Sequence, residues 1–238
     1  MRLDKFLAHV TGDSRSHVKK MLKQKAVRVD GEVVTSAGFH VDVNRQQVTA
    51  FGDALFYQPF AYLMMNKPQG YLSATSDGKQ ATVMALLAAS DRRWDLSIAG
   101  RLDKDTEGLL LLTNDGQFLH DVITPKKKVY KKYVAHIEGV LTEQAKCALE
   151  TGVTIKDGKN MTFTTAPARV RILADGEVEI DICEGKFHQV RRMFASVGCQ
   201  VVYLKRKAIG NLMLDADLKL GAYRPLSEEE LHEIKKNT

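Results

Sequence analysis

The chain has 238 residues, of which 44% are hydrophobic and 27% are charged, values close to those of ordinary globular proteins. This composition excludes a disordered or collagen-like chain. No apolar stretch approaches the roughly 20 residues that a membrane-spanning helix needs, so we expect no association with a membrane. The length predicts two domains, one large and one small.

The first residues and the cysteines both favour a protein of the cytoplasm. Charged residues stand where a signal peptide would have its apolar segment, namely Arg2, Asp4, Lys5 and His9. The three cysteines are widely spaced and form no C-x-x-C pair, so we expect neither a disulfide framework nor a zinc site.

Positive charge is concentrated near the N-terminus. The formal net charge of the whole chain is +6. Residues 1–50 hold nine Lys or Arg and five Asp or Glu, which gives +4, and the other 188 residues carry the remaining +2. This asymmetry favours a polyanionic partner, although charge alone leaves nucleic acid as one of two equal alternatives.

Two short helices and a hairpin are predicted at the N-terminus. The apolar residues of the first helix recur at helical spacing, at Leu3, Phe6, Leu7 and Val10. Ser14 is a good N-cap for a second helix, with its apolar residues at Val18, Met21 and Leu22. Val27 and Val29 then alternate with polar residues, and Asp30-Gly31 suits the two-residue turn of a type I′ hairpin that returns at Val33.

The second predicted helix is strongly basic. Six basic residues and no acidic residue lie between Ser14 and Val29. We predict that this helix binds RNA through Arg15, Lys19, Lys20 and Lys23. The alternative is a solvated helix that only covers a small core. Around 51–59 the basic pattern and the periodicity are lost, which predicts a linker.

The rest of the chain predicts more strands than helices. A short apolar run at 61–65 ends in a turn at 66–70 that contains one Pro and one Gly. Further strands are expected at 97–102, 109–113, 130–137, 166–173, 178–183 and 201–204, and helices at 82–89, 142–151 and 188–197. Because strands and helices do not alternate regularly, we predict an α+β fold around a mostly antiparallel mixed sheet.

A dense polar segment, GRLDKDTEG at 100–108, lies between two apolar strands. A calcium loop is excluded because its twelfth position, which needs a bidentate Glu, is Asn114. A phosphate-binding loop is excluded because Gly-Lys-Ser/Thr occurs nowhere in the chain. Loops on rigid strands often carry active sites, and a plain surface turn is the alternative.

This segment resembles the catalytic motif of the RsuA and RluA group of pseudouridine synthases through Gly100-Arg101-Leu102-Asp103, Asp105-Thr106 and Gly108-Leu109-Leu110. Three other segments resemble the same group in the same order, namely LMMNKPQG at 63–70, KKY at 131–133 and EGKFHQVRRMF at 184–194. The N-terminal residues resemble an S4 RNA-binding domain. The resemblance covers almost the whole chain and implies an S4 domain with linker at 1–58 and a catalytic domain at 59–238.

The resemblance implies an enzyme that isomerises one uridine in ribosomal RNA without a cofactor or a metal ion. The reaction breaks the bond from ribose C1′ to uracil N1 and joins C1′ to C5, so it needs no redox agent and no phosphate donor. A base within folded RNA must first be extruded, at a cost of a few kcal/mol that contacts with the protein offset.

The resemblance also assigns roles to single residues. Asp103 is the essential carboxylate, either as a nucleophile at C1′ or as a base toward the ribose. Arg191 is expected to pair with Asp103 through two hydrogen bonds and to keep it ionised. Tyr133 is expected to stack on the base, and its alternative is a core residue of a strand. Arg101 either holds a phosphate of the extruded nucleotide or only screens Asp103.

Other polar residues of this domain receive no firm role. We assign none to His188 and Gln189, because no Ser or Cys nucleophile accompanies them and a His at the start of a helix is commonly structural. The basic runs at 126–128, 131–132 and 205–207 either follow the RNA backbone or are solvated strand ends.

RsuA relatives divide among several sites in ribosomal RNA. The compact length, the S4 domain and the lack of a long basic tail look most like the members that act on uridine 516 of 16S ribosomal RNA. We therefore expect 16S RNA or a small-subunit assembly particle as the partner, and a monomeric enzyme. The alternatives are a synthase for a 23S site and a non-catalytic S4-domain protein of RNA binding or ribosome assembly.

Overall fold

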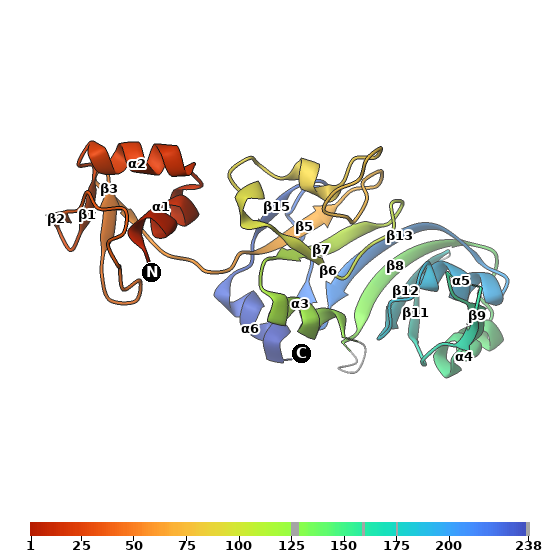
Figure 1. Ribbon diagram of the computed structural model, residues 1–238. Coiled ribbons are helices and arrows are strands. Elements are labelled where there is room, and N and C mark those ends of the chain that lie inside the picture. Colours follow the sequence, from red (N-terminus) through yellow and green to blue (C-terminus); the bar gives the residue numbers. More distant parts are fainter. Residues whose placement is uncertain (125–128, 159, 175, 237–238) are drawn as a thin grey trace. The chain divides into compact units, whose positions relative to one another are not determined.

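The chain divides into two compact units, Met1–Phe60 and Ala61–Thr238 (Figure 1). The coordinates are a computed structural model that describes residues 1–124, 129–158, 160–174 and 176–236. Within these residues no helix is long and apolar enough to cross a membrane. In the same described part, no three His, Cys, Asp or Glu side chains are arranged to bind a metal ion.

The first unit is a pair of helices packed against a small antiparallel sheet. Its elements are α1 Leu3–Thr11, α2 Arg15–Lys23, β1 Val27–Val29, β2 Glu32–Val33, β3 Val48–Ala50 and β4 Asp53–Leu55. The sheet has the order β2-β1-β3-β4. Ser14 begins α2 as its N-cap, because its hydroxyl oxygen accepts a hydrogen bond from the main-chain nitrogen of His17. Asp30 and Gly31 both have positive φ, as the predicted hairpin turn requires.

Apolar side chains from every part of this unit form one core. It includes Leu3, Phe6, Leu7, Val18, Met21, Leu22, Val27, Val29, Val41, Val48 and Ala50. The predicted apolar faces of both helices are therefore confirmed. The prediction of a linker from residue 51 is wrong in its first part, because Phe51 and Gly52 form a positive-φ turn and β4 pairs with β3. Only three residues follow that turn in the strand, too few for a periodic pattern.

The second unit is built on one large mixed sheet. Its elements are β5 Tyr62–Lys67, η1 Val83–Leu86, η2 Arg92–Trp94, β6 Ser97–Ala99, β7 Glu107–Thr113, α3 Gly116–Ile123, β8 Lys131–Glu138, α4 Glu143–Thr151, β9 Thr154–Lys156, β10 Thr162–Thr164, β11 Arg169–Ala174, β12 Glu177–Ile182, α5 Gln189–Ser196, β13 Gln200–Ile209, β14 Leu212–Met213, β15 Tyr223–Pro225 and α6 Glu228–Lys236.

The strands of the main sheet follow the order β11-β12-β8-β13-β7-β5-β15, while β6 pairs with β7 and β14 with β13 outside this order. The pair of β7 and β13 is parallel. The other strand pairs recorded for this sheet within the described residues are antiparallel. The predicted α+β fold with a mostly antiparallel sheet is confirmed.

The strand β7 lies near the centre of the sheet and is covered on both faces. Leu109 and Leu111 belong to one core with residues of α3 and α6, whereas Leu110 and Leu112 belong to the core on the other face. Successive side chains of a strand point to opposite faces, so covering both faces requires an unbroken apolar run. The end of such a strand is a rigid place from which to hold a loop (Figure 1).

One helix prediction for this unit is wrong, and two of its helices were not predicted. The helix expected at 82–89 is only the 3-10 turn η1, because main-chain hydrogen bonds from Leu72 to Ala81 and from Val83 to Leu72 hold its start beside another segment. The helices α3 and α6 were not predicted. The start of α3 is nonetheless marked in the sequence, since Asp115 accepts hydrogen bonds from two main-chain nitrogens of its first turn.

Candidate active site

The polar segment 100–106 connects β6 to β7 in a hairpin. Ser97, Ile98 and Ala99 pair with Thr113, Leu112 and Leu111. The segment then leaves the sheet and returns at Glu107, where β7 begins. The carboxylate of Asp103 therefore stands at the middle of a loop whose two ends are tied to a buried strand.

A buried lysine holds the middle of this loop. Lys67 lies at the end of β5 and is 0% exposed. Its Nζ donates to the main-chain oxygens of Asp103 at 3.0 Å and Thr106 at 2.9 Å, and more weakly to that of Lys104 at 3.4 Å. Burial lowers the pKa of Lys67 to about 8, against the opposing effect of the nearby carboxylates. The motif NKP at 66–68 thus supplies a support for the loop, a role that the sequence did not reveal.

Main-chain contacts fix the loop further. The Ser73 hydroxyl donates to the main-chain oxygen of Leu102 at 2.7 Å, and the main-chain nitrogen of Leu102 donates back to it at 3.1 Å. The main-chain nitrogen of Gly70 donates to the oxygen of Lys104 at 2.9 Å. Because these partners are neighbours on both sides of Asp103, the loop has little freedom to move.

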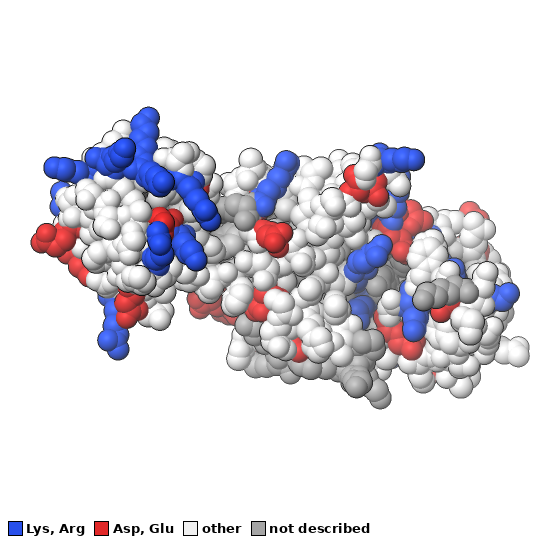
Figure 2. Space-filling model, in the orientation of Figure 1, with Lys and Arg blue, Asp and Glu red and all other residues white. Residues whose placement is uncertain are grey.

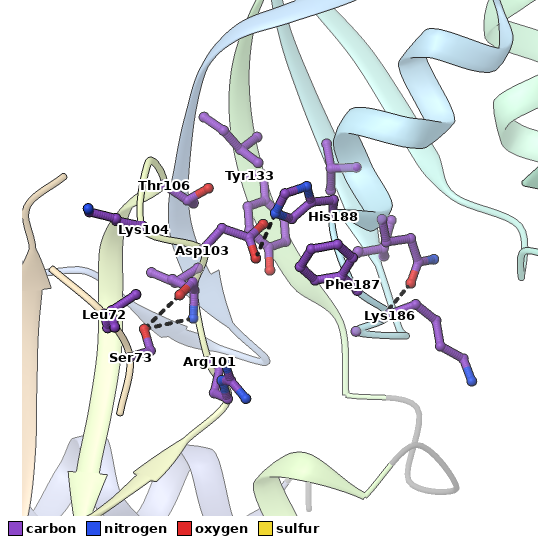
Figure 3. Close-up of a pocket in the computed structure, with 16 residues that line it drawn as sticks. Leu72, Ser73, Arg101, Asp103, Lys104, Thr106, Tyr133, Lys186, Phe187 and His188 are labelled. Atoms are coloured by element: carbon purple, nitrogen blue, oxygen red, sulfur yellow. Dashed lines mark hydrogen bonds and ion pairs between the residues drawn. The ribbon is translucent and has the colours of Figure 1, made fainter. Parts of the chain in front are cut away.

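A cavity of about 430 Å³ opens beside this loop. Arg101, Asp103 and Thr106 line one side of it, and Tyr133 and His188 are among the residues of the other sides (Figure 3). Ligand pockets commonly have volumes of roughly 300 to 1,000 Å³, so this cavity is large enough for one nucleotide. The loop, strand β8 and the start of α5 thus meet at one site.

Burial raises the pKa of the Asp103 carboxyl above its usual value, and the charge of Asp105 raises it further. Positive charges on His188, Arg191 and Lys67 oppose this rise. The Asp103 side chain nevertheless remains 29% exposed, so its carboxylate is accessible from the cavity.

The structure corrects the expected partner of Arg191. Its guanidinium forms an ion pair with Asp105, at 2.9 Å between Nη2 and Oδ2, and donates to the main-chain oxygen of Val201 at 2.9 Å. No direct ion pair with Asp103 is recorded among the described residues. The reason is geometric, because the side chain leaves the first turn of α5 toward the far end of the loop. Its charge still acts on Asp103 across space.

The side chain that faces Asp103 is instead His188, with 3.7 Å between Nε2 and Oδ1, and the two form an ion pair when the imidazole is protonated (Figure 3). His188 has a φ of 52°, in the left-handed region, immediately before α5 begins. The Phe187 ring stacks on its imidazole with the ring centroids 3.8 Å apart. His188 is therefore a cavity residue that the sequence did not assign, and its place beside Gln189 and Arg191 in the motif was the available indication.

Tyr133 and Arg101 also border the cavity. Tyr133 lies on β8, between Ile180 of β12 and Arg206 of β13. It is 7% exposed and packs in the main core, as its alternative interpretation expects, and it also lines the cavity, so stacking on a base stays a prediction. Arg101 is exposed beside the cavity, two residues after β6 ends at Ala99.

The basic runs of this unit have mixed environments. Residues 126–128 lie outside the described residues. Lys132 forms an ion pair with Glu179 at 2.8 Å. Lys131 and Arg206 are buried, at 8% and 1% exposure, so neither is a solvated strand end nor a contact for the RNA backbone. Alternation along β8 and β13 turns every second side chain inward, which explains why adjacent basic residues differ so much.

The four basic residues predicted to bind RNA lie exposed on α2. Lysine and arginine side chains gather over this helix in Figure 2. Arg15 and Lys19 also line a groove of about 500 Å³ together with Arg2 and Lys5 of the α1 region, which the sequence did not single out. Among the described residues, Arg15, Lys19, Lys20 and Lys23 have no recorded ion pair, so their charges face solvent.

Comparison with known proteins assigns both units. A family model described as RNA pseudouridylate synthase matches residues 61–196, and an S4 domain model matches residues 1–46. The Bacillus subtilis (strain 168) protein named uncharacterized RNA pseudouridine synthase YtzG is 47% identical over 236 residues, covering 98% of this chain and 97% of that protein.

Two further relatives span the full chain. The ribosomal small subunit pseudouridine synthase A of Escherichia coli (strain K12) is 40% identical over 235 residues, covering 98% of this chain and 100% of that protein. A solved structure described as a crystal structure of pseudouridylate synthase matches with a TM-score of 0.69 and 36% identity over 98% of this chain and 99% of its own. The fold and the site thus define an RNA-modifying isomerase with an S4 domain. The chain belongs to the RNA pseudouridylate synthase family.

Proposed function

We propose that this enzyme converts one uridine of small-subunit ribosomal RNA to pseudouridine, and that uridine 516 of 16S RNA is its target. The observation that carries the catalytic part is the Asp103 carboxylate, which lines a cavity of about 430 Å³ on a rigid loop. The small-subunit target is supported by the name of the Escherichia coli relative, which matches over the whole chain.

Asp103 is the reacting carboxylate in this proposal. It acts as a nucleophile at C1′ or as a base toward the ribose, and both roles require the ionised form. The C1′–N1 bond breaks, C1′ joins C5, the hydrogen on C5 leaves as a proton, and N1 gains a proton. Burial opposes ionisation of Asp103, while the charges of Arg191 and Lys67, and that of His188 when it is protonated, lower its pKa and favour the ionised form.

Tyr133 and Arg101 complete the nucleotide site. The Tyr133 ring borders the cavity and offers a face for stacking of the extruded uracil, and stacking on an aromatic ring is worth roughly 1–3 kcal/mol per base. Arg101 lies exposed at the cavity and is well placed to bind a phosphate of the same nucleotide. The catalytic set that we propose is therefore Asp103, Tyr133 and Arg191, with Arg101 as an RNA contact.

The first unit is proposed to supply most of the sequence-independent affinity for RNA. Its exposed basic residues on α2 can each neutralise a phosphate and release a counterion. This arrangement separates tasks, because the S4 unit attracts the RNA while the cavity selects and converts one base. We place the reaction in the cytoplasm, on free 16S RNA or a small-subunit assembly particle.

Mapping of pseudouridine across ribosomal RNA tests this proposal. RNA is compared from cells that carry the gene, cells that lack it, and cells that carry only the Asp103→Asn variant. We expect one site in 16S RNA to be modified in the first strain alone. Modification at a 23S site would reject the proposed target, and an unchanged map in the deletion strain would reject a role in ribosomal RNA.

A further inference from the structure

One edge of β7 changes partner beside the loop that carries Asp103. The strand β5 occupies the other edge along its whole length. On the first edge, β6 pairs with residues 111–113, whereas β13 pairs with residues 107 and 108. The main chain at residues 109 and 110 therefore lies between two neighbours. Buried carbonyl groups at such a position need another partner.

The side chain of Arg206 fills this gap. Its Nε donates to the main-chain oxygen of Leu109 at 2.8 Å, and its Nη2 donates to that of Gly100 at 2.6 Å. Gly100 begins the loop, and Leu109 follows its return to β7. Because the guanidinium is planar and its donors are fixed relative to one another, one side chain holds both ends of the loop at a set separation.

A glycine at each end of the loop has a positive φ, and the one at position 108 also allows the close approach of Arg206. Gly108 has a φ of +102°, and a Cβ placed there would lie 2.2 Å from the main-chain oxygen of Arg206. Gly100 has a φ of +81°, and its Cβ would lie 3.7 Å from Nη1 of Arg206. The contact at Gly108 excludes any side chain at that position. The loop is thus fitted against both the main chain and the side chain of Arg206.

The burial of Arg206 is costly, which argues against a role in stability alone. The residue is 1% exposed, and its recorded side-chain hydrogen bonds within the described residues go to carbonyl oxygens. Burial of a charge without a counter-charge destabilises a folded chain, and apolar residues of similar volume often serve stability better. A geometric task explains why a guanidinium occupies this place.

We propose that Arg206 is a positioning residue of the isomerisation, which fixes both ends of the loop 100–106 and thereby the direction in which the Asp103 carboxylate enters the cavity. This inference rests on the proposed catalytic role of Asp103. A displacement of about 1 Å at a reacting group costs roughly 100-fold in rate, so loss of the two hydrogen bonds should act mainly on the chemical step.

Two substitutions of Arg206 and one control test the proposal in the full-length protein. Arg206→Met keeps an unbranched chain but removes both hydrogen bonds, and Arg206→Lys keeps the charge without the planar fork. Lys131→Met is the matched control. Lys131 is also a buried cation of this sheet, at 8% exposure, but it donates to the main-chain oxygen of Val129 and not to the loop.

Three quantities are measured for each variant at 10 °C. Single-turnover release of tritium from uridine C5 in ribosomal RNA gives the chemical rate, fluorescence anisotropy gives the Kd for RNA, and circular dichroism gives the folded fraction. We expect Arg206→Met to lower the chemical rate by roughly 100-fold and to change the Kd by less than about twofold. The Arg206→Lys variant should react about tenfold faster than Arg206→Met and about tenfold more slowly than the unaltered enzyme. Lys131→Met should leave the rate per folded molecule unchanged.

The proposal is overturned by a folded Arg206→Met or Arg206→Lys variant whose rate stays within about threefold of the unaltered enzyme, since misplacement should cost far more. Failure of both variants to fold would also overturn it, because Arg206 would then be a stability residue. Asp103→Asn is assayed alongside. If that variant is active, the proposed function of the site fails, whereas an inactive Asp103→Asn with a fully active Arg206→Met rejects the positioning role alone.

Discussion

The first unit carries its basic residues at the surface of α2, whereas the second unit buries Lys67, Lys131 and Arg206 within its sheet. Surface charges act on a polyanion over about 10 Å at ordinary ionic strength and are screened by salt. Buried cations act through short hydrogen bonds to carbonyl oxygens and are screened much less. In the proposed function, the same residue types therefore serve RNA affinity in the first unit and loop geometry in the second, and salt and pH should separate the two effects.

The largest effect is expected for Asp103→Asn. The amide keeps the volume of the side chain but removes the charge, so isomerisation should fall by roughly four orders of magnitude or more, out of the total acceleration of 10⁶-fold or greater that is typical of enzymes. The Kd for RNA should stay almost unchanged. Tritium release measures the rate, and anisotropy measures the affinity. Asp217→Asn is the control, because Asp217 is exposed and does not line the cavity.

The Asp103→Asn substitution should also change how the free energy of unfolding depends on pH. The pKa of Asp103 is raised in the folded state, so its protonated form favours folding, and this contribution is lost as the pH rises through the folded-state pKa. The Asp103→Asn variant should therefore gain stability relative to the unaltered protein as the pH increases from acidic to neutral. Denaturant unfolding of both proteins at an acidic and at a neutral pH measures this gain in stability. A variant that is less stable at neutral pH would contradict the burial of this carboxylate.

A second, smaller effect concerns Lys67 and pH. With a folded-state pKa of about 8, Lys67 loses a proton above that pH and retains two donors for its carbonyl partners instead of three. We expect kcat to fall by roughly tenfold above pH 8, as the loop loosens. The free energy of unfolding should rise as the pH increases above 8, because Lys67 is then protonated to a greater extent in the unfolded state than in the folded state.

Lys67→Met provides the test, and Lys131→Met is again the control. The Lys67→Met variant should have a low kcat at every pH and lack the decline near pH 8, which steady-state rates across pH 6–10 would record. A decline that persists in the variant would assign that titration to another group.

A third effect belongs to the first unit. Substitution of Lys19, Lys20 and Lys23 by Ala should weaken RNA binding and lower the slope of log Kd against log salt by roughly 0.7 for each lost contact with single-stranded RNA. The chemical rate at saturating protein should not change. The matched control replaces three exposed lysines of the second unit, Lys79, Lys156 and Lys219. If the control lowers the slope of log Kd against log salt by an equal amount, α2 is not the preferred surface for RNA.

The smallest effect is expected for the cap of the same helix. Ser14→Ala removes the hydroxyl that accepts a hydrogen bond from the first turn of α2, and it should lower stability by about 1 kcal/mol. Thr142→Ala removes the corresponding cap of α4. Both variants should lose similar stability in denaturant unfolding, but only Ser14→Ala should weaken RNA binding. Equal RNA affinity in the two variants would show that order in α2 is unimportant for binding.

Local patterns predicted the parts of the fold that local physics determines. The apolar spacing of α1 and α2, the Asp30-Gly31 turn and the apolar run of β7 all depend on residues close in sequence. The segment 82–89 failed for the opposite reason, because contacts with Leu72 override its helical composition. The helix α6 was not predicted because its first turn consists of three glutamates and the segment has little apolar periodicity.

The sequence predicted which residues form the candidate site better than it predicted their contacts. The motifs placed Asp103 and Tyr133 at one cavity, and their catalytic roles stay predictions. The sequence predicted Asp103 as the partner of Arg191, whereas the structure shows Asp105. The difference arises because the orientation of α5 decides where its side chains reach. The supports provided by Lys67 and Arg206 were invisible, because their partners are main-chain oxygens, which no sequence motif encodes.

The close contact between Gly108 and the main chain of Arg206 also limits how this enzyme can be redesigned. Any larger residue at 108 would collide with the neighbouring strand, so the boundary between loop and strand cannot shift along the chain. Engineering that aims to lengthen the reach of the proposed catalytic carboxylate, Asp103, for example toward a bulkier base, must therefore change the loop within residues 101–106, before Gly108. That window is short, and it makes substrate redesign from this side of the cavity harder than from the side formed by α5.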